Sequence, residues 1–258
     1  MEKDIDENDE DMFTDYKDAF HTSYNLAESV NLGGDTKSAY VLYLAGNSNK
    51  SAIAAGLSTS KISVCDVSCL SEKASFESYK DGDLSGLMFS PKNENLIYAC
   101  SPQECIRLWD IRDCRKPARS FIDTSTQNKR VENGHEKGEG QTDFSKKPLI
   151  CMDVNINDEF LVGGTEQVVK DAFLLFWDVG SGKMLGGYWD SYGDDVTTVA
   201  FHPEDANKLA TGGTDGLINV FDVSQSSEDD ALITSINTES SIQDICWYKV
   251  SHFENYKF

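Results

Sequence analysis

The stretch "CIRLWDI", residues 105–111, contains the pattern that decides the fold. Its apolar residues Ile106 and Leu108 alternate with polar ones and lead into a Trp–Asp pair, Trp109 and Asp110. A period of two is typical of a β-strand with two different faces. The same pattern closes three other segments: "KISVCDV" at 61–67, "FLLFWDV" at 173–179 and "LINVFDV" at 217–223. The recurrence of this pattern predicts an internal structural repeat.

The final aspartates of the four segments set the repeat length. Asp66, Asp110, Asp178 and Asp222 follow one another at intervals of 44, 68 and 44 residues, a period near 44 with one expansion. Each unit contains short β-branched and aromatic runs, including a fourth run such as "ARSFID" at 118–123 or "ALITSIN" at 231–237. A repeat of about 40 to 45 residues with four strands is typical of a β-propeller blade.

The repeats resemble those of the WD40 family, in which a blade strand ends at a Trp–Asp pair. The resemblance assigns this structural role to Trp109 and Asp110, Trp177 and Asp178, and Phe221 and Asp222. The predicted fold class is therefore all-β, a WD40 propeller of about four complete blades. A fifth copy begins at "IQDICWYK", 242–249, and contributes only its first strand, so the expected ring is incomplete.

Family members often link a Trp, a Ser or Thr, a His and an Asp within one blade through hydrogen bonds. The fourth repeat keeps much of this pattern, with Thr211 and Asp215 in place, Tyr192 at the His position and Phe221 at the Trp position. "ATGGTDG" at 210–216 leads from one strand into another rather than into a helix, which excludes a phosphate loop of the usual kind. Asp215 and Gly216 are instead predicted to turn a hairpin.

The pattern divides the chain into a propeller and its flanks. Residues 1–20 contain nine acids against two lysines, and 1–24 are predicted to be an acidic, disordered tail. Residues 25–250 form the partial propeller, with a polar, flexible insertion between blades at 123–147. Residues 251–258 are a non-repeat end. A seven-bladed ring of this period needs roughly 300 residues of blades, so a truncated propeller is expected.

Composition limits the possible partners. A net charge of −21 disfavours nucleic acid and anionic membrane surfaces, and the longest apolar runs are far shorter than a membrane span. We expect a soluble protein of the cytoplasm or nucleus. The seven cysteines form no CxxC pair and no cluster with histidine, which favours reduced structural thiols and indicates no metal or cofactor.

An enzymatic function has little support in the sequence. The four histidines, at 21, 135, 202 and 252, are scattered, and no nucleophile, base and orienting residue share a motif. The predicted function is a non-catalytic scaffold whose loops and rims bind other proteins. A catalytic propeller, with residues gathered at a central channel, stays open as a third hypothesis.

The stretch "WDIRDCRK" suggests a more specific alternative. It concentrates Arg112, Arg115 and Lys116 in an otherwise acidic chain. "WDIR" resembles the WDxR pattern of substrate receptors of cullin-4 ubiquitin ligases, which implies that Arg112 contacts a ligase adaptor. The guanidinium fork suits bidentate pairing with an acceptor. We predict these three residues as a protein-docking site, with Arg112 projecting from the loop after the third blade strand.

Overall fold

The fold is that of a computed structural model, which describes residues 29–32, 39–80, 82–125, 147–249 and 256–257. The chain divides into two units, Met1–Asn31 and Leu32–Phe258, and the account below concerns the second. The predicted acidic tail at 1–24 lies outside the described residues. So do 126–146 of the predicted insertion and all of the predicted end at 251–258 except 256–257.

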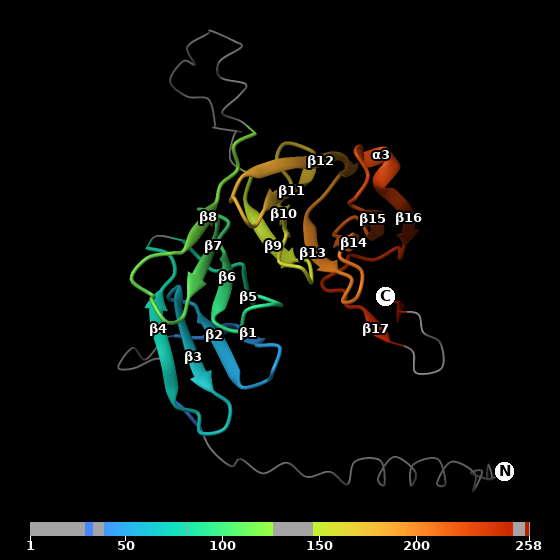
Figure 1. The fold of residues 1–258 in the computed structure, drawn as a ribbon. Helices are drawn as coiled ribbons and strands as arrows, with labels where there is room; N and C mark the ends of the chain where they lie inside the picture. The colour runs from blue at the N-terminus through green and yellow to red at the C-terminus, as the bar shows by residue number, and fades with distance from the viewer. Residues whose placement is uncertain (1–28, 33–38, 81, 126–146, 250–255, 258) are drawn as a thin grey trace, which may run out of the picture. The chain divides into compact units, whose positions relative to one another are not determined.

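Four antiparallel sheets of four strands each make up the described fold (Figure 1), and we call them blades 1 to 4. Blade 1 contains β1 (Val41–Gly46), β2 (Ala52–Leu57), β3 (Lys61–Asp66) and β4 (Glu72–Glu77). Blade 2 contains β5 (Gly86–Phe89), β6 (Leu96–Cys100), β7 (Ile106–Asp110) and β8 (Arg119–Phe121). Blade 3 contains β9 (Leu149–Val154), β10 (Phe160–Thr165), β11 (Ala172–Asp178) and β12 (Met184–Tyr192). Blade 4 contains β13 (Val196–Phe201), β14 (Lys208–Gly213), β15 (Leu217–Asp222) and β16 (Leu232–Asn237).

Strand register confirms the predicted repeat. In every blade the third strand ends at the repeat aspartate, which pairs with the first residue of the second strand. The preceding residue pairs with the second residue of that strand; the four pairs are Cys65↔Ile53, Trp109↔Ile97, Trp177↔Leu161 and Phe221↔Leu209. The same local sequence therefore produces the same backbone pairing four times.

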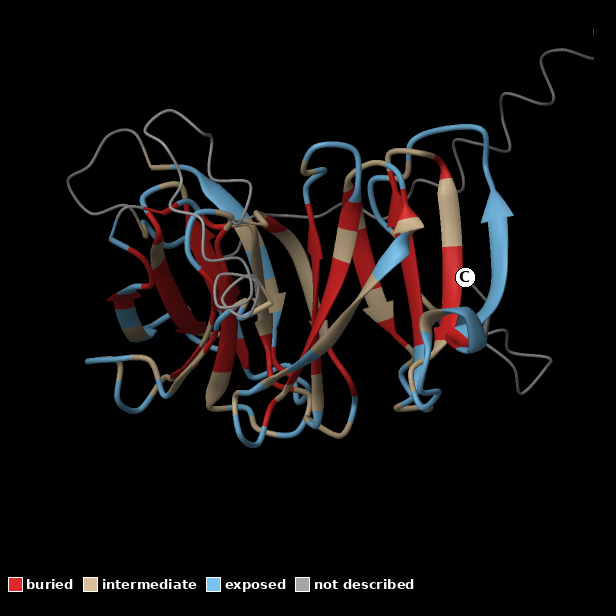
Figure 2. Ribbon diagram, turned by 90° about the horizontal axis from the view of Figure 1, so that it is seen from above, coloured by how far each residue is buried: buried red, intermediate tan, exposed pale blue. Residues whose placement is uncertain are grey.

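The core lies between the blades, where the faces of neighbouring sheets meet (Figure 2). The first strands of successive blades lie side by side, β1 with β5, β5 with β9 and β9 with β13. Trp109 of blade 2 packs on Phe76 of blade 1, with ring centroids 4.8 Å apart. Trp177 lies in the cluster between blades 2 and 3, and Phe221 in the cluster between blades 3 and 4. Each repeat aromatic thus packs against the preceding blade.

The residues predicted to begin a fifth blade lie beside β13. Thr197 Oγ1 donates to the carbonyl of Ile242, and Trp247 Nε1 donates to that of Ala200 at 3.0 Å. Residues 242–247 form no ladder, because a β-ladder requires a partner strand and none of the described residues supplies one. Only β17 (Tyr248–Lys249) follows, paired with β18 (Tyr256–Lys257).

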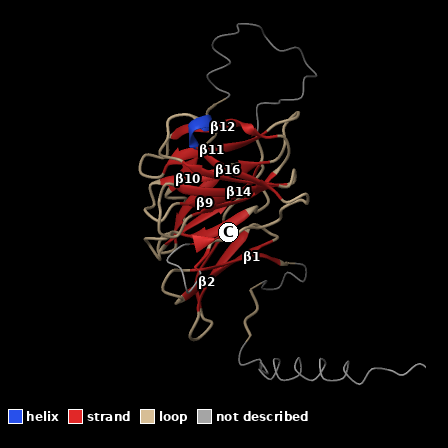
Figure 3. Cartoon of the chain, turned by 90° about the vertical axis from the view of Figure 1, so that its right-hand side faces the viewer, coloured by secondary structure: helices blue, strands red, loops and turns tan. Residues whose placement is uncertain are grey.

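Turns and helices add little to the described fold. The hairpin between β14 and β15 contains Gly216 at φ +80°, which confirms the predicted Asp215–Gly216 turn. The single helix among the described residues is the one-turn α3 (Glu228–Ala231), visible beside the strands in Figure 3. No helix in the described part of the chain is long and apolar enough to cross a membrane.

Candidate protein-docking site at the junction of blades 2 and 3

The turn after β7 places the predicted docking residues outside the sheet. Arg112 follows the strand end by two residues, as predicted, and its side chain is 65% exposed. Its guanidinium binds the Asp110 carboxylate in a bidentate manner, with Nε 2.9 Å from one oxygen and the terminal nitrogen 2.7 Å from the other. Asp110 Oδ1 also accepts from the Arg112 backbone amide, which caps the strand end.

Ion pairing neutralises most of the charge on this turn. The hydrogen bond from Arg112 holds the pKa of Asp110 below its usual value. Arg115 forms the same bidentate pair with Asp113 and lowers the pKa of that carboxyl to about 2. Lys116 has no ion pair among the described residues. The turn is exposed and polar, but Lys116 alone carries its net positive charge.

Arg119, which the docking prediction did not include, joins blade 2 to blade 3. Its guanidinium donates to the carbonyls of Val179 and Gly180, in the turn after β11. Gly182 closes that turn at φ +73°, and a Cβ there would lie 2.9 Å from Arg119 Cδ. Only glycine meets both conditions without strain. Two carbonyls fix the position of Arg119, and no carboxylate among the described residues forms an ion pair with it.

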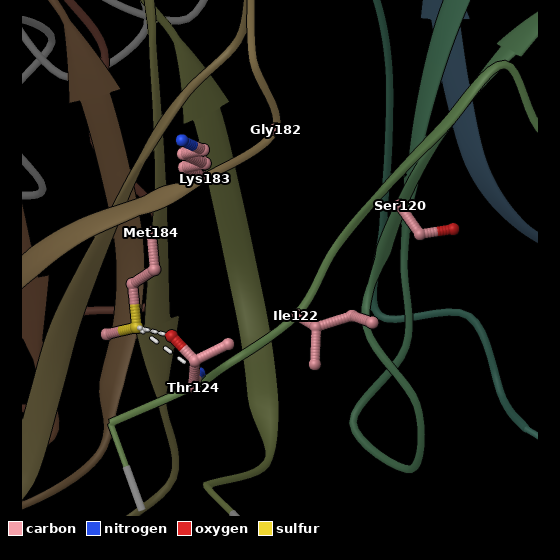
Figure 4. Close-up of a pocket in the computed structure, with 6 residues that line it drawn as sticks. All are labelled: Ser120, Ile122, Thr124, Gly182, Lys183 and Met184. Atoms are coloured by element: carbon pink, nitrogen blue, oxygen red, sulfur yellow. Dashed lines mark hydrogen bonds between the residues drawn. The ribbon is translucent and has the colours of Figure 1, made fainter. Parts of the chain in front are cut away.

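A cleft of about 390 Å³ opens at this junction, between the outer strand of blade 2 and blade 3 (Figure 4). The cleft is lined by Ser120, Ile122 and Thr124 on one side and by Gly182, Lys183 and Met184 on the other. The Thr124 backbone amide lies 3.4 Å from Met184 Sδ, and the two side chains approach each other across the cleft. Trp177 Nε1 donates to the Ile122 carbonyl at 3.0 Å, so the repeat tryptophan fixes one wall of the cleft.

Both ends of the predicted insertion meet beside this cleft. Lys147 Nζ lies 2.9 Å from Asp123 Oδ2 and 2.7 Å from Ser125 Oγ, and the lysine side chain is 9% exposed. The ammonium also lies over the rings of Phe173 and Trp189, 5.7 and 5.5 Å from their centroids. Lys147 therefore links the two described ends of the insertion predicted at 123–147.

Only part of the family's hydrogen-bonded pattern is present in blade 4. Tyr192 OH and Thr211 Oγ1 are hydrogen-bonded, as their positions predict, and both residues are buried. Asp215 takes no part, since it accepts from the backbone amide of Leu217 at the turn. Blade 2 has a counterpart that the sequence comparison missed, because Tyr79 OH donates toward the carbonyls of Ala99 and Cys105 at 2.7 and 2.6 Å.

The repeat tryptophans and aspartates predicted to be structural lie in the cores between blades and at the ends of the third strands. Trp109 and Trp177 are buried, but Trp109 Nε1 has no hydrogen-bond partner among the described residues. Asp178 and Asp222 accept hydrogen bonds from the hydroxyls and backbone amides of Ser181 and Ser224 in their own turns, and these bonds lower the pKa of both carboxyls. Within the described ranges no three potential ligands gather as a metal site.

Comparison with known proteins agrees with this architecture. The family model of the WD domain, G-beta repeat matches residues 185–222, which run from the outer strand of blade 3 to the third strand of blade 4. A solved chain of the mitotic checkpoint complex superposes with a TM-score of 0.62 at 17% identity, covering 82% of this chain and 55% of that one. The described fold is a WD40-type β-propeller, and residues 185–222 match the WD repeat model.

Several curated WD repeat proteins are similar over part of their length. The WD repeat-containing protein 89 homolog of Dictyostelium discoideum is 27% identical over 157 residues, 61% of this chain and 35% of that protein. An uncharacterized WD repeat-containing protein of Schizosaccharomyces pombe is 32% identical over 155 residues, 57% of this chain and 40% of the relative. One from Saccharomyces cerevisiae is 29% identical over 245 residues, 91% of this chain and 55% of the relative. The chain therefore spans between 35% and 55% of the length of these three relatives.

Proposed function

We propose that this chain is a non-catalytic scaffold that binds other proteins at the junction of blades 2 and 3. WD repeat propellers generally serve as interaction scaffolds, which supports the broad class. Two surface features carry the specific site: the exposed turn at 112–116 on blade 2, and the open cleft between blades 2 and 3 that Trp177 and Arg119 hold in shape. Loops positioned by a rigid scaffold are common binding surfaces.

Affinity purification of the full chain from cells tests this proposal. Proteins that co-purify with the wild-type chain should be lost when the exposed turn is altered by the triple change Arg112→Ala, Arg115→Ala and Lys116→Ala. The matched control is Lys170→Ala, which changes an exposed lysine in the hairpin between β10 and β11. Retention of every partner by the triple variant would assign binding elsewhere on the propeller.

A second candidate function is that of a substrate receptor docking on the adaptor of a cullin-4 ubiquitin ligase. The exposed position of Arg112, after the third strand of its blade, favours this role. The Asp110 pair holds the guanidinium in one orientation, so adaptor binding would require an acceptor that shares or replaces this partner.

Arg112→Ala distinguishes the two candidates. If the chain is a ligase receptor, this variant should lose the adaptor while remaining folded, because losing a buried charge-assisted contact in an interface costs about 2 kcal/mol or more. Lys170→Ala is the control, because it removes an exposed basic side chain in the hairpin between β10 and β11, outside the predicted docking residues. Equal adaptor recovery with wild type and Arg112→Ala would exclude docking through Arg112.

A further inference from the structure

We propose that the cleft between blades 2 and 3 binds an acidic, extended segment of a partner protein. This inference rests on the proposed scaffold function and specifies the chemistry of the partner. The relevant groups are Arg119 and Lys183 at the rim and Ile122 and Met184 along the walls. None of these four residues belongs to the turn at 112–116.

Local charge favours an acidic partner. Lys183 is exposed and has no ion pair among the described residues, and Arg119 is held by carbonyl oxygens rather than by a carboxylate. Both cations lie near Asp178: hydrogen bonds from Ser181 are the main cause of the lowered pKa of that carboxyl, and the fields of Arg119 and Lys183 add to them. Two cations beside one carboxylate leave a positive site on a chain of net charge −21. Such a site attracts carboxylates or phosphates.

The shape of the cleft favours an extended chain. One wall is formed by the alternate residues 120, 122 and 124 of β8 and its continuation, and the outer edge of β8 has no partner strand among the described residues. Ile122 is 53% exposed on this wall. A peptide that placed an apolar side chain on Ile122 would cover exposed apolar surface.

The equivalent cleft between blades 3 and 4 provides an internal comparison. It has a volume of about 220 Å³, and the turn after β15 contributes Gln225 and Ser226 to its lining. No basic residue lines it. Its neighbour Glu228 is already bonded to the backbone amides of Trp189 and Asp190 on β12. The two clefts therefore lie at equivalent junctions and differ in charge, so acidic segments should select the first.

Peptide selection on the intact protein tests the inference. Phage-displayed random peptides are selected on the immobilised full chain, and the affinities of the recovered peptides are measured by fluorescence anisotropy. We expect enrichment of Asp and Glu beside an apolar residue. Lys183→Glu should weaken binding by at least about tenfold, equivalent to about 1.4 kcal/mol. Binding to the wild-type chain should also weaken with added salt.

Two variants make the result specific. Lys170→Glu reverses the same charge in the hairpin between β10 and β11 and should leave the dissociation constant unchanged. Ile122→Ser keeps the cations and should weaken binding through loss of apolar contact. Recovered peptides without acidic enrichment, or equal affinity for Lys183→Glu and Lys170→Glu, would overturn the inference. In that case, cellular partners that still depend on residues 112–116 would leave the scaffold function standing.

Discussion

Blade 1 and blade 3 have the same strand order and register, yet one position on the face that each turns toward a preceding blade differs in burial. Ile53 of blade 1 and Leu161 of blade 3 occupy the same register position, and their exposures are 39% and 0%. The repeat position beside them is Cys65 in blade 1 and Trp177 in blade 3. Blade 2 packs on the face of blade 3, whereas none of the described residues places a sheet on that face of blade 1. At this register position, burial is therefore supplied by the neighbouring blade.

The largest expected effect on stability comes from Trp177→Ala, which removes a buried side chain from the junction of blades 2 and 3. Trp177 is fully buried and its Nε1 bonds to Ile122, so we expect a loss of about 3 to 5 kcal/mol in the free energy of unfolding. Urea denaturation followed by circular dichroism measures it. Cys65→Ala, at the equivalent position of blade 1, should cost about 1 kcal/mol. Similar losses in the two variants would contradict the dependence on a neighbouring blade.

Replacing the equivalent aliphatic residues of blades 3 and 1 tests directly whether a neighbouring blade supplies the burial at this position. Leu161→Ala should destabilise the protein by about 2 to 5 kcal/mol, because it leaves a cavity between packed blades. Ile53→Ala should cost less than about 1 kcal/mol, because its side chain already contacts solvent. Denaturation midpoints of the two variants, measured under one set of conditions, give the difference. An equally large loss for Ile53→Ala would show that its face is covered.

A third prediction concerns pH at the junction of blades 3 and 4. Asp153 Oδ2 accepts from the Phe201 backbone amide at 2.6 Å, and burial raises the pKa of this carboxyl to about 7. The ordinary value of about 3.9 applies in the unfolded chain, so between these values the folded state holds the extra proton. Stability should fall as pH rises from about 4 to about 7, by at most about 1.4 kcal/mol per pH unit.

Asp153→Asn provides the control, since it cannot titrate. The difference in unfolding free energy between wild type and this variant should change over that pH range and become constant above it. The equivalent residue in blade 1 is Ala45, which pairs with Ala54 as Asp153 pairs with Val162. A pH-independent difference would mean that the Asp153 carboxyl has an ordinary pKa.

The smallest expected effect belongs to Arg112→Ala, outside the junction core. The Arg112–Asp110 pair is solvent-exposed, and such pairs contribute about 0 to 1 kcal/mol. We therefore expect a change in stability of less than about 1 kcal/mol, measured by the same denaturation curves. A loss above that value would show that the pair holds the turn in place and would weaken Arg112→Ala as a binding test.

The blade architecture could be predicted because its determinants are local. Alternation with a period of two and the recurring aspartate placed the ends of β3, β7, β11 and β15 correctly. The position of Arg112 outside the sheet followed from the same rule. Its pairing with Asp110 did not, because "WDIR" leaves the orientation of the side chain open.

The contacts across junctions were beyond sequence reasoning. Arg119 reaches the turn after β11, some 60 residues later in the chain, and no local pattern indicates this. Tyr79 offered a weak signal, since it precedes Ala99 by 20 residues as Tyr192 precedes Thr211 by 19. The one-residue difference removes it from the ungapped alignment of the two repeats.

The ion pair between Lys147 and Asp123 makes the sequence between them a permissive site for insertion. Lys147 holds the two ends together, because it contacts Asp123, Ser125 and two aromatic rings. We therefore expect the packing of the blades not to depend on the length of the sequence between the two ends. Loop-closure entropy grows slowly, and doubling a loop costs only about 0.6 kcal/mol. We expect a tag or a small folded domain introduced there to leave the propeller intact, which gives the protein a place where sequence can change in length without a change in fold.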